Sequence, residues 1–162
     1  MKTTDLSDQF ETELQIVEPG FLDFGGRAQF SGPIVTVEAP DDNSKVREQL
    51  ERPGLGQVLV VEGHASKSCA LLGDLLGELA VKNGWAGIVV NGYVRDSARL
   101  GELPLGVKAL GAFPRKSEKK GRGSVGETLR FAGVEFVSGH MLYADEDGIV
   151  VSSQPLTLSP TA

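Results

Sequence analysis

The segment from Gly73 to Asp96, GDLLGELAVKNGWAGIVVNGYVRD, has an acidic residue near its start and an Arg-Asp pair at its end. Asp74 follows Gly73 where a helical apolar pattern restarts, so it is a candidate helix N-cap. A helix N-terminus leaves backbone N–H groups without intrahelical partners, here those of Leu75 and Leu76. Together with the helix dipole, these donors are able to bind a carboxylate. The start of the segment is therefore either a simple cap or part of an anion site.

Arg95 and Asp96 follow the apolar run AGIVVNGY at 86–93, which predicts a buried strand. Ligands of open α/β sheets bind in the crevice outside the carboxyl ends of the strands. A guanidinium group there suits an oxyanion, and a carboxylate beside it suits a hard cation. The alternative is an exposed pair of neighbouring charges, which contributes little to stability. Spacing alone leaves both interpretations open.

The elements that would position these residues are alternating strands and helices. Strands are predicted from β-branched runs between turn residues at 33–39, 56–63, 86–93 and 107–113. Helices are predicted within 1–22 with a cap near Thr4-Asp5, at 45–54, and from Ser66 to a stop at Asn83-Gly84. Hairpins are predicted at 128–137 and 141–153. The strand–helix–strand order predicts a parallel, right-handed crossover, which would bring Asp74 and Arg95-Asp96 into one crevice.

Length and composition limit the class of protein. The 162 residues suit one domain, 1–162, in which residues 154–162 are expected to be a frayed tail. The net charge of −6 argues against direct nucleic-acid binding and requires any anion site to be locally basic or to hold a metal. The single cysteine excludes an intrachain disulfide, and no run approaches the length of a membrane span. We therefore expect a cytoplasmic protein that does not bind a membrane.

Several blocks of the chain resemble one known family. Asp74, twenty intervening residues and then Arg95-Asp96 is similar to the signature of the class II pyruvate aldolases related to 4-hydroxy-4-methyl-2-oxoglutarate aldolase. The resemblance to RraA-like proteins, which include the regulator of ribonuclease activity A, extends over FGGRAQFSGPIVTVEAPDDN, VLVVEG, GWAGIVVNGYVRD, GVKALGAFPRKS and LYADEDGIVV. This family contains both aldolases and ribonuclease-binding regulators.

The resemblance implies an α/β class, single-domain β/β/α fold. It also implies a ring-shaped homotrimer or a stacked pair of trimers, with active sites at subunit interfaces. A divalent cation, Mg²⁺ or Mn²⁺, would be held by Asp96, partly through water. Arg95 would contact the keto or enolate oxygen of a pyruvyl group. Gly73 and the backbone of Leu75 and Leu76 would bind the substrate carboxylate, and Asp74 would orient or deprotonate a metal-bound water.

The implied activity is cleavage of short 2-oxo dicarboxylic acids through a pyruvate enolate, whose charge a divalent ion and an arginine can stabilise. Retro-aldol cleavage of 4-hydroxy-4-methyl-2-oxoglutarate and decarboxylation of oxaloacetate both follow this route. The alternative is a protein that binds and inhibits a ribonuclease E-type endonuclease. Regulators that have lost the aldolase signature break the Arg-Asp pair, which is intact here, so catalysis is favoured.

The chain also departs from the aldolase pattern. Longer aldolases of the family carry a C-terminal extension that supplies an acidic residue to a neighbour's site, and no such extension is expected here. His140 lies where relatives often have an acidic residue. An older family label, a menaquinone-biosynthesis methyltransferase, has no support, because no methyl-donor glycine motif follows a first strand.

Other candidate motifs have ordinary interpretations. GRGSVG at 121–126 has the spacing of a dinucleotide fingerprint but lies between a polar run and a strand, so a Rossmann site is rejected. The basic run PRKSEKKGR at 114–122 is a solvated loop or, alternatively, rims the active site through Arg115 and Lys116. Lys82 and Lys108 are expected at the surface.

The sulfur and imidazole side chains do not form an evident site. Cys69 is expected to be a buried structural thiol on the apolar face of the helix predicted from Ser66. His64 and His140 are the only histidines, and two isolated ones make a poor zinc site. His64, after a strand end, is a candidate for the border of the crevice.

Overall fold

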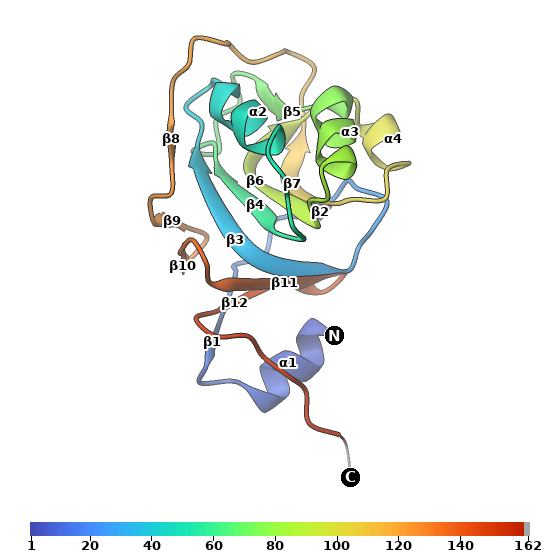
Figure 1. Ribbon diagram of the computed structural model, residues 1–162, viewed down its shortest axis with the longest axis vertical. Coiled ribbons are helices and arrows are strands. Elements are labelled where there is room, and N and C mark those ends of the chain that lie inside the picture. The colour runs from blue at the N-terminus through green and yellow to red at the C-terminus, as the bar shows by residue number, and fades with distance from the viewer. Residues whose placement is uncertain (161–162) are drawn as a thin grey trace.

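Four parallel strands form the centre of the main sheet, at the positions where the sequence predicts strands (Figure 1). They are, in spatial order, β3 (Phe30–Glu38), β4 (Val58–Glu62), β6 (Gly87–Val94) and β7 (Gly106–Ala112). Every residue of β4 is buried, as expected for a parallel strand covered on both faces. The computed structural model describes residues 1–160.

Antiparallel strands extend the sheet on both sides. Beyond β3 come β11 (Met141–Asp145), β12 (Gly148–Ser152) and β1 (Leu14–Ile16), and beyond β7 comes β2 (Leu22–Asp23). The first four residues of β3 continue the antiparallel region, and its later residues pair with β4 in parallel. This long strand therefore joins the two halves of the sheet.

Short strands complete the β structure. They are β5 (Ala70–Leu72), which pairs in parallel with β6, β8 (Ser124–Val125), which pairs with β3, and the separate hairpin of β9 (Leu129–Phe131) and β10 (Val134–Phe136). Both predicted hairpins, at 128–137 and 141–153, are confirmed. The parallel pairing around α3 is also present, whereas the handedness of the crossover stays a prediction.

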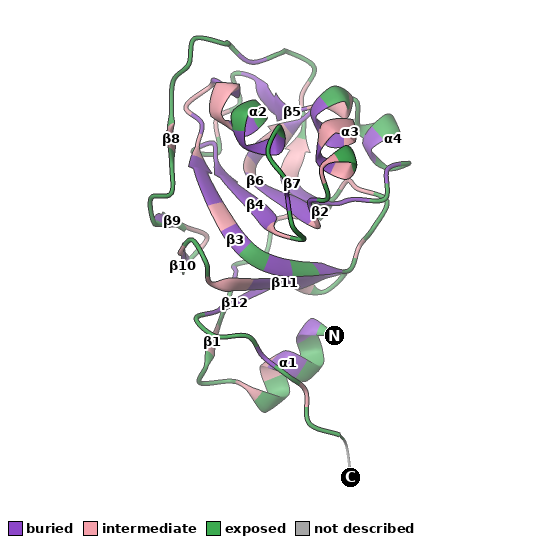
Figure 2. Ribbon diagram, in the orientation of Figure 1, coloured by how far each residue is buried: buried purple, intermediate pink, exposed green. Residues whose placement is uncertain are grey.

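Two helices, α2 (Ser44–Leu50) and α3 (Asp74–Lys82), cover one face of the parallel strands, with the short α4 (Ser97–Leu100) beside α3 (Figures 1 and 2). The buried side chains between them include Leu50, Leu76 and Ile88. Helix α3 ends at the predicted stop, where Asn83 is the C-cap and Gly84 has a φ of +80°. This layer fixes where the N-terminus of α3 lies relative to the strand ends.

The opposite face of the sheet packs against the hairpin β9–β10. Phe136 of β10 is fully buried and stacks on Phe131, with ring centroids 4.4 Å apart. These rings contact a second core cluster that includes Phe30 and Leu142. Gly87 of β6 and Gly106 of β7 are paired and make room for the Phe30 ring. A Cβ at either position would lie within 2.3 Å of this ring.

The N-terminal helix α1 (Thr3–Gln9) packs on β11 and β12 at the end of the molecule far from α2 and α3 (Figure 1). The cap expected near Thr4-Asp5 is wrong, because Lys2 is the N-cap and makes no side-chain cap bond. Thr3 instead anchors the helix, donating from its N–H and its hydroxyl to the Asp145 carboxylate at 2.7 Å each. In the C-terminal segment, Leu156 is buried in the same cluster and its N–H donates to the Tyr143 hydroxyl, while residues 161–162 lie outside the described part.

Two further expectations from the sequence are wrong. The helix predicted from Ser66 is a loop, then β5, and only then α3, because Ala70–Leu72 pair with β6. Lys108 is not at the surface: it is 2% exposed, forms an ion pair with Asp23 at 3.1 Å and donates to the Asp145 carbonyl oxygen at 2.6 Å. Among residues 1–160, no helix is long and apolar enough to cross a membrane.

Candidate active site

The pairing of β5 with β6 places the two ends of the Gly73–Asp96 segment side by side. Leu72 is opposite Val94 in this ladder, and the Arg95 N–H donates to the Leu72 carbonyl oxygen at 2.8 Å. Both strands end here, one at the start of α3 and the other at Arg95-Asp96. The pairing of β5 with β6 therefore brings Asp74 and Arg95 close together, although twenty residues separate them in the sequence.

A cleft of about 150 Å³ lies at this edge of the sheet. All six predicted site residues line it: Gly73, Asp74, Leu75, Leu76, Arg95 and Asp96. The remaining lining residues are Asn43, Arg47, Ala70, Leu72, Lys116, Ser117 and Lys119. A volume equal to about five water molecules suits a small organic acid.

Helix α3 points its N-terminus at the cleft. Gly73, not Asp74, is the N-cap, and Asp74 is the first helical residue, so the predicted cap is wrong by one position. The first i→i−4 hydrogen bond runs from the Gly77 N–H to the Gly73 carbonyl oxygen. Within residues 1–160 the N–H groups of Leu75 and Leu76 have no hydrogen-bond acceptor, so they are available to an anion.

Arg95 and Asp96 present a positive and a negative group to the same space. The Arg95 Nε and Asp96 Oδ2 atoms are 4.0 Å apart, and the two side chains are 41% and 46% exposed. Asp96 has a φ of 54°, a left-handed conformation that few side chains other than asparagine and aspartate adopt easily. The sharp change of direction after β6 aims these side chains at the cleft instead of continuing the strand.

The carboxylates at the cleft suit a hard divalent cation that keeps most of its water. Within the described residues, no three His, Cys, Asp or Glu side chains form a cluster able to hold a metal ion. That donor set excludes a structural zinc site, which needs four protein ligands. Mg²⁺ is commonly bound by one or two carboxylates together with substrate and water, and Asp96 on an open cleft fits this mode.

Gly73 leaves room for the Arg-Asp pair. A Cβ at this position would lie 3.0 Å from Asp96 Oδ2 and 3.4 Å from Arg95 Cγ. The Gly73 φ of −133° is one that any residue adopts, so the reason for glycine is the contact with these side chains and not the backbone.

We expect Gly73→Ala to reduce the turnover of the 2-oxo acid cleavage implied by the sequence about tenfold, because the added methyl displaces Arg95 and Asp96 by tenths of an ångström. The unfolding midpoint should stay nearly unchanged. Steady-state kinetics with a urea unfolding curve measure both effects. Gly92→Ala is the matched control, since a Cβ on this β6 glycine meets nothing closer than 3.6 Å. Equal activities in the two variants would contradict the close packing at Gly73.

The second wall of the cleft comes from two segments that the site prediction did not include. Asn43 is the N-cap of α2 and Arg47 lies in its last turn. Lys116, Ser117 and Lys119 lie on the loop after β7. Their proximity follows from topology, because α2 follows β3 and the loop follows β7, and the carboxyl ends of parallel strands meet at one edge. The polar runs PDDNS and PRKSEKK follow two of the predicted strands, so this rule places both runs beside the cleft.

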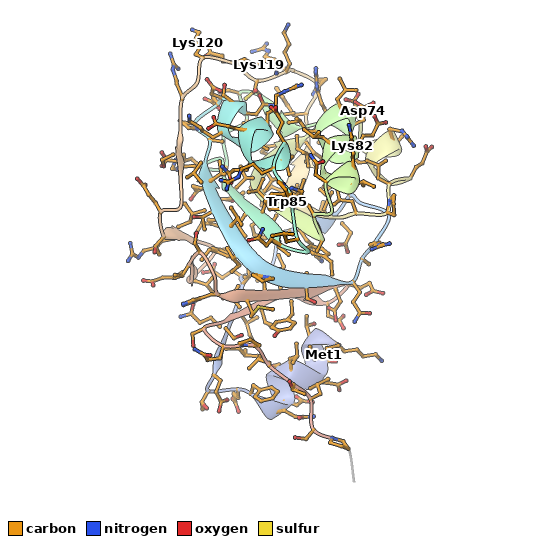
Figure 3. The ribbon with its side chains drawn as sticks, viewed as in Figure 1. Met1, Asp74, Lys82, Trp85, Lys119 and Lys120 are labelled. Carbon is orange, nitrogen blue, oxygen red and sulfur yellow. The ribbon has the colours of Figure 1, made fainter. Side chains whose placement is uncertain are left out.

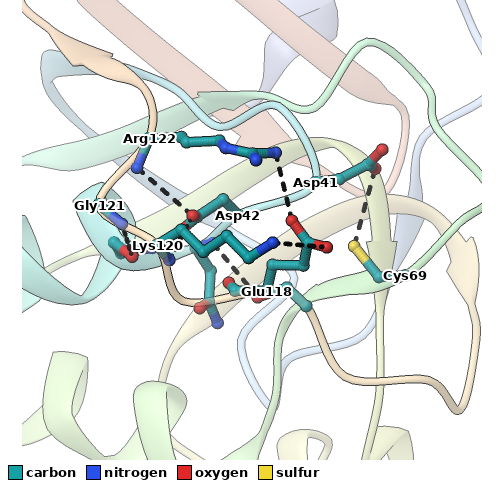
Figure 4. Close-up of polar contacts among 10 residues, drawn as sticks. Asp41, Asp42, Cys69, Glu118, Lys120, Gly121 and Arg122 are labelled. Atoms are coloured by element: carbon teal, nitrogen blue, oxygen red, sulfur yellow. Dashed lines mark hydrogen bonds and ion pairs between the residues drawn. The ribbon is translucent and has the colours of Figure 1, made fainter.

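Asp42 connects the start of α2 to the loop after β7 through hydrogen bonds to both (Figure 4). It is fully buried, and its Oδ1 accepts from the Ser44 N–H and hydroxyl. Its Oδ2 accepts from the N–H groups of Lys120 and Arg122, at 2.6 and 3.3 Å. Burial alone would raise the pKa of Asp42, but these hydrogen bonds outweigh it and lower the pKa from 3.8 to about 2.

We expect Asp42→Asn to lower the free energy of unfolding by about 2 kcal/mol at pH 7, since the depressed pKa of Asp42 measures how strongly the fold stabilises its charged form. A group with a lowered folded pKa stabilises fully above its ordinary value of 3.8 and loses this effect as the pH falls toward about 2. Denaturant unfolding at pH 7, 5, 4 and 3 should therefore show the gap between wild type and variant narrowing below pH 4. A gap that stays constant with pH would contradict the role of the charge.

Several other candidates lie away from the cleft. His64 follows β4 at the same edge but pairs with Glu38, Nε2 to Oε2 at 3.1 Å, and does not line the cleft. Of the two basic residues proposed for the rim, Lys116 lines it and Arg115 does not. His140 lies in a separate depression near β12.

Cys69 is buried, as predicted, but lies in the loop before β5 and not on a helix. Burial and the neighbouring Asp41, whose Oδ1 is 3.7 Å from Sγ, raise the pKa of the thiol to about 11 (Figure 4). The thiol is therefore protonated at neutral pH and unsuited to act as a nucleophile.

Taken together, the fold and the cleft define a mixed α/β protein with a small cleft, lined by charged residues and the N-terminus of α3, at the carboxyl edge of a parallel sheet. The RraA-like family model, Aldolase/RraA, matches residues 3–151, and the chain belongs to this family. The family predicted from the sequence is thereby confirmed.

Relatives of known name agree with this assignment. Proteins from Alkalilimnicola ehrlichii and Laribacter hongkongensis are 57% and 55% identical over 95% of this chain, covering 96% and 97% of their own lengths. Both are named "Putative 4-hydroxy-4-methyl-2-oxoglutarate aldolase".

Two solved structures have the same fold. The RNA-processing inhibitor RraA from Thermus thermophilis has a TM-score of 0.93 and 45% identity, covering 97% of this chain and 95% of its own. A Geobacillus kaustophilus protein named S-adenosylmethionine:2-dimethylmenaquinone methyltransferase has a TM-score of 0.94 and 47% identity, covering 99% of this chain and 100% of its own.

Proposed function

We propose that this protein is a divalent-metal-dependent lyase that cleaves short 2-oxo acids through a pyruvate enolate. The observation that carries the proposal is the convergence of Arg95, Asp96 and the free N–H groups of α3 on one small cleft. The names of the relatives, at 55–57% identity, support the aldolase activity. Retro-aldol cleavage of 4-hydroxy-4-methyl-2-oxoglutarate and decarboxylation of oxaloacetate are the two proposed reactions.

In this proposal the chain binds the 2-oxo acid end of the substrate through complementary charge. The N–H groups of Leu75 and Leu76 bind the C1 carboxylate, favoured by the α3 dipole. The Arg95 guanidinium donates to the C2 oxygen, which becomes negative when the bond breaks. Asp96 would hold Mg²⁺ or Mn²⁺, which supplies Lewis-acid stabilisation of negative charge on the substrate when bound.

Both reactions break the C3–C4 bond and move its electron pair toward the C2 oxygen, giving the same pyruvate enolate. In the retro-aldol direction the C4 hydroxyl loses its proton, and Asp74, which lines the cleft at the start of α3, would be the group that moves it. In oxaloacetate, C4 leaves as carbon dioxide. The enolate then takes a proton at C3 to become pyruvate.

Product stoichiometry tests this chemistry. Cleavage of 4-hydroxy-4-methyl-2-oxoglutarate should give two pyruvate molecules for each substrate consumed, and oxaloacetate should give one. Turnover should require added Mg²⁺ or Mn²⁺ and stop on chelation. Equal turnover in chelator and in metal would overturn the metal-dependent mechanism.

A methyltransferase function is not proposed, although the Geobacillus relative has that name. In the sequence, no methyl-donor glycine motif follows a first strand.

The second candidate function is binding and inhibition of a ribonuclease E-type endonuclease. The close structural match to an RNA-processing inhibitor, with a TM-score of 0.93, favours it, and the net charge of −6 suits a protein partner better than RNA. An inhibition assay with such an enzyme tests it, and no effect at micromolar protein would count against it.

We also propose a ring-shaped homotrimer, alone or as a stacked pair. The family membership supports this proposal. Leu75 at the cleft and Leu22 on the edge strand β2 are 72% and 56% exposed, and we propose that they lie at subunit interfaces. Light scattering after size-exclusion chromatography gives the mass directly. A monomer at micromolar concentration would contradict this assembly.

A further inference from the structure

The cleft has more positive charge than the proposed chemistry uses. Arg95 faces the reacting oxygen, but Arg47, Lys116 and Lys119 also line the same space. The protein as a whole has a net charge of −6, but four cationic side chains line this cleft against the two carboxylates of Asp74 and Asp96. Arg47 pairs with Glu51 at 3.4 Å, so the two lysines supply most of this local reversal of charge. Such a reversal attracts anions.

The two lysines are not neutralised by the protein. Within residues 1–160, neither Lys116 nor Lys119 forms an ion pair; the Lys119 Nζ donates to the neutral Asn43 Oδ1 at 3.4 Å. By contrast, the acidic residue of their own loop, Glu118, pairs with Lys120 and Arg122. Lys116 and Lys119 line the cleft, whereas Glu118 is paired with Lys120 and Arg122 (Figure 4). Lys119 and Lys120 are neighbours on this loop at one end of the molecule (Figure 3).

Hydrogen bonds from the loop backbone to Asp42 and Ser44 hold the loop that carries these lysines in place. Asp42 binds the N–H groups of Lys120 and Arg122, and the Gly121 N–H donates to the Ser44 hydroxyl at 3.0 Å. On the cleft side, the Asn43 N–H donates to the Ser117 hydroxyl at 3.2 Å. These bonds fix the loop against α2, so that Lys116 and Lys119 keep their positions beside Arg47.

We propose that Arg47, Lys116 and Lys119 form a subsite for the second carboxylate of the substrate, and that Asp42 is the residue that positions it. This inference rests on the proposed 2-oxo acid site, which takes the other end of the molecule. The subsite selects dicarboxylates over 2-oxo acids with an apolar tail, because a charged hydrogen bond is made only when the distal carboxylate is present.

Binding of two unreactive five-carbon ligands tests the subsite without turnover. 2-Oxoglutarate and 2-oxopentanoate share the 2-oxo acid end and differ in the distal carboxylate. By calorimetry in the presence of Mg²⁺, the wild-type protein should bind 2-oxoglutarate at least about tenfold more tightly. Lys116→Gln combined with Lys119→Gln should remove most of this preference and leave 2-oxopentanoate affinity within about twofold.

Lys120→Gln is the matched control, since this neighbouring lysine pairs with Glu118 and does not line the cleft, and it should keep the wild-type preference. Asp42→Asn should reduce the preference while retaining 2-oxopentanoate binding, a change that general destabilisation would not produce. Equal binding of both ligands by the wild type, or a preference that survives the double variant, would overturn the subsite alone. Binding of neither ligand would overturn the 2-oxo acid site and the subsite together.

Discussion

Asp96→Asn is expected to reduce metal-dependent pyruvate formation by at least about 10²-fold, because the amide lacks the negative charge that would hold the cation. Asparagine keeps the size of the side chain and accepts the left-handed backbone, here a φ of 54°, so the fold should be preserved. Alanine at this position would add backbone strain to the loss of charge. The asparagine variant therefore isolates the electrostatic role.

Asp41→Asn is the matched control for this experiment. Asp41 also has a left-handed φ, 57°, but faces Cys69 and does not line the cleft. Its variant should retain near wild-type turnover, and both variants should have similar unfolding midpoints. Full activity of Asp96→Asn at low metal concentration would show that Asp96 does not hold the cation.

Arg95→Ala is expected to lower kcat by about 10²–10³-fold, the usual cost of removing one preorganised contact to a developing oxyanion. Arg95→Lys should recover only part of the loss, since an ammonium group keeps the charge but lacks the planar fork. The effect should appear in kcat more than in KM, because the charge on the C2 oxygen develops in the transition state.

Arg99 provides the corresponding control. It lies four residues further along, pairs with Glu78 and Glu102 at 3.1 and 3.0 Å, and does not line the cleft. Arg99→Ala should leave kcat unchanged. Equal losses in the two alanine variants would point to general damage and not to catalysis by Arg95.

The strands of the central sheet could be predicted because their patterns are local. The runs at 58–62 and 87–94 are apolar, rich in valine and bounded by glycine or polar residues, which is typical of buried parallel strands. Arg95 and Asp96 directly follow the second of these strands, and ligands of open α/β sheets bind outside the carboxyl ends of the strands. The predicted strand–helix–strand crossover then brings Asp74 into the same crevice as Arg95 and Asp96.

Features that depend on distant partners could not be predicted. Ala70–Leu72 is only three residues long and fits a helical spacing equally well, so its pairing with β6 decides its structure. Lys108 has the appearance of a surface lysine until β2 brings Asp23 within 3.1 Å. In both cases the deciding contact comes from a segment that no local pattern identifies.

The basic side of the cleft, formed by Arg47, Lys116 and Lys119, could be predicted only in part. The basic run at 114–122 was visible in the sequence, and Lys116 was placed at the rim, but Arg47, Asn43 and Lys119 were not. Asp42 makes the difference, because its buried carboxylate joins two loops that are about eighty residues apart. A buried aspartate in a turn gives no sequence signal of which backbone it will bind.

The most direct test of the account is pyruvate release from oxaloacetate by the wild-type protein and by Asp96→Asn, with Mg²⁺, with Mn²⁺ and with chelator. The spontaneous metal-driven decarboxylation must be subtracted with a protein-free reaction. We predict turnover by the wild type that requires the metal and is lost in the variant. Wild-type release no faster than the protein-free reaction would contradict the lyase, leave the cleft without the proposed chemistry, and favour the ribonuclease-binding function.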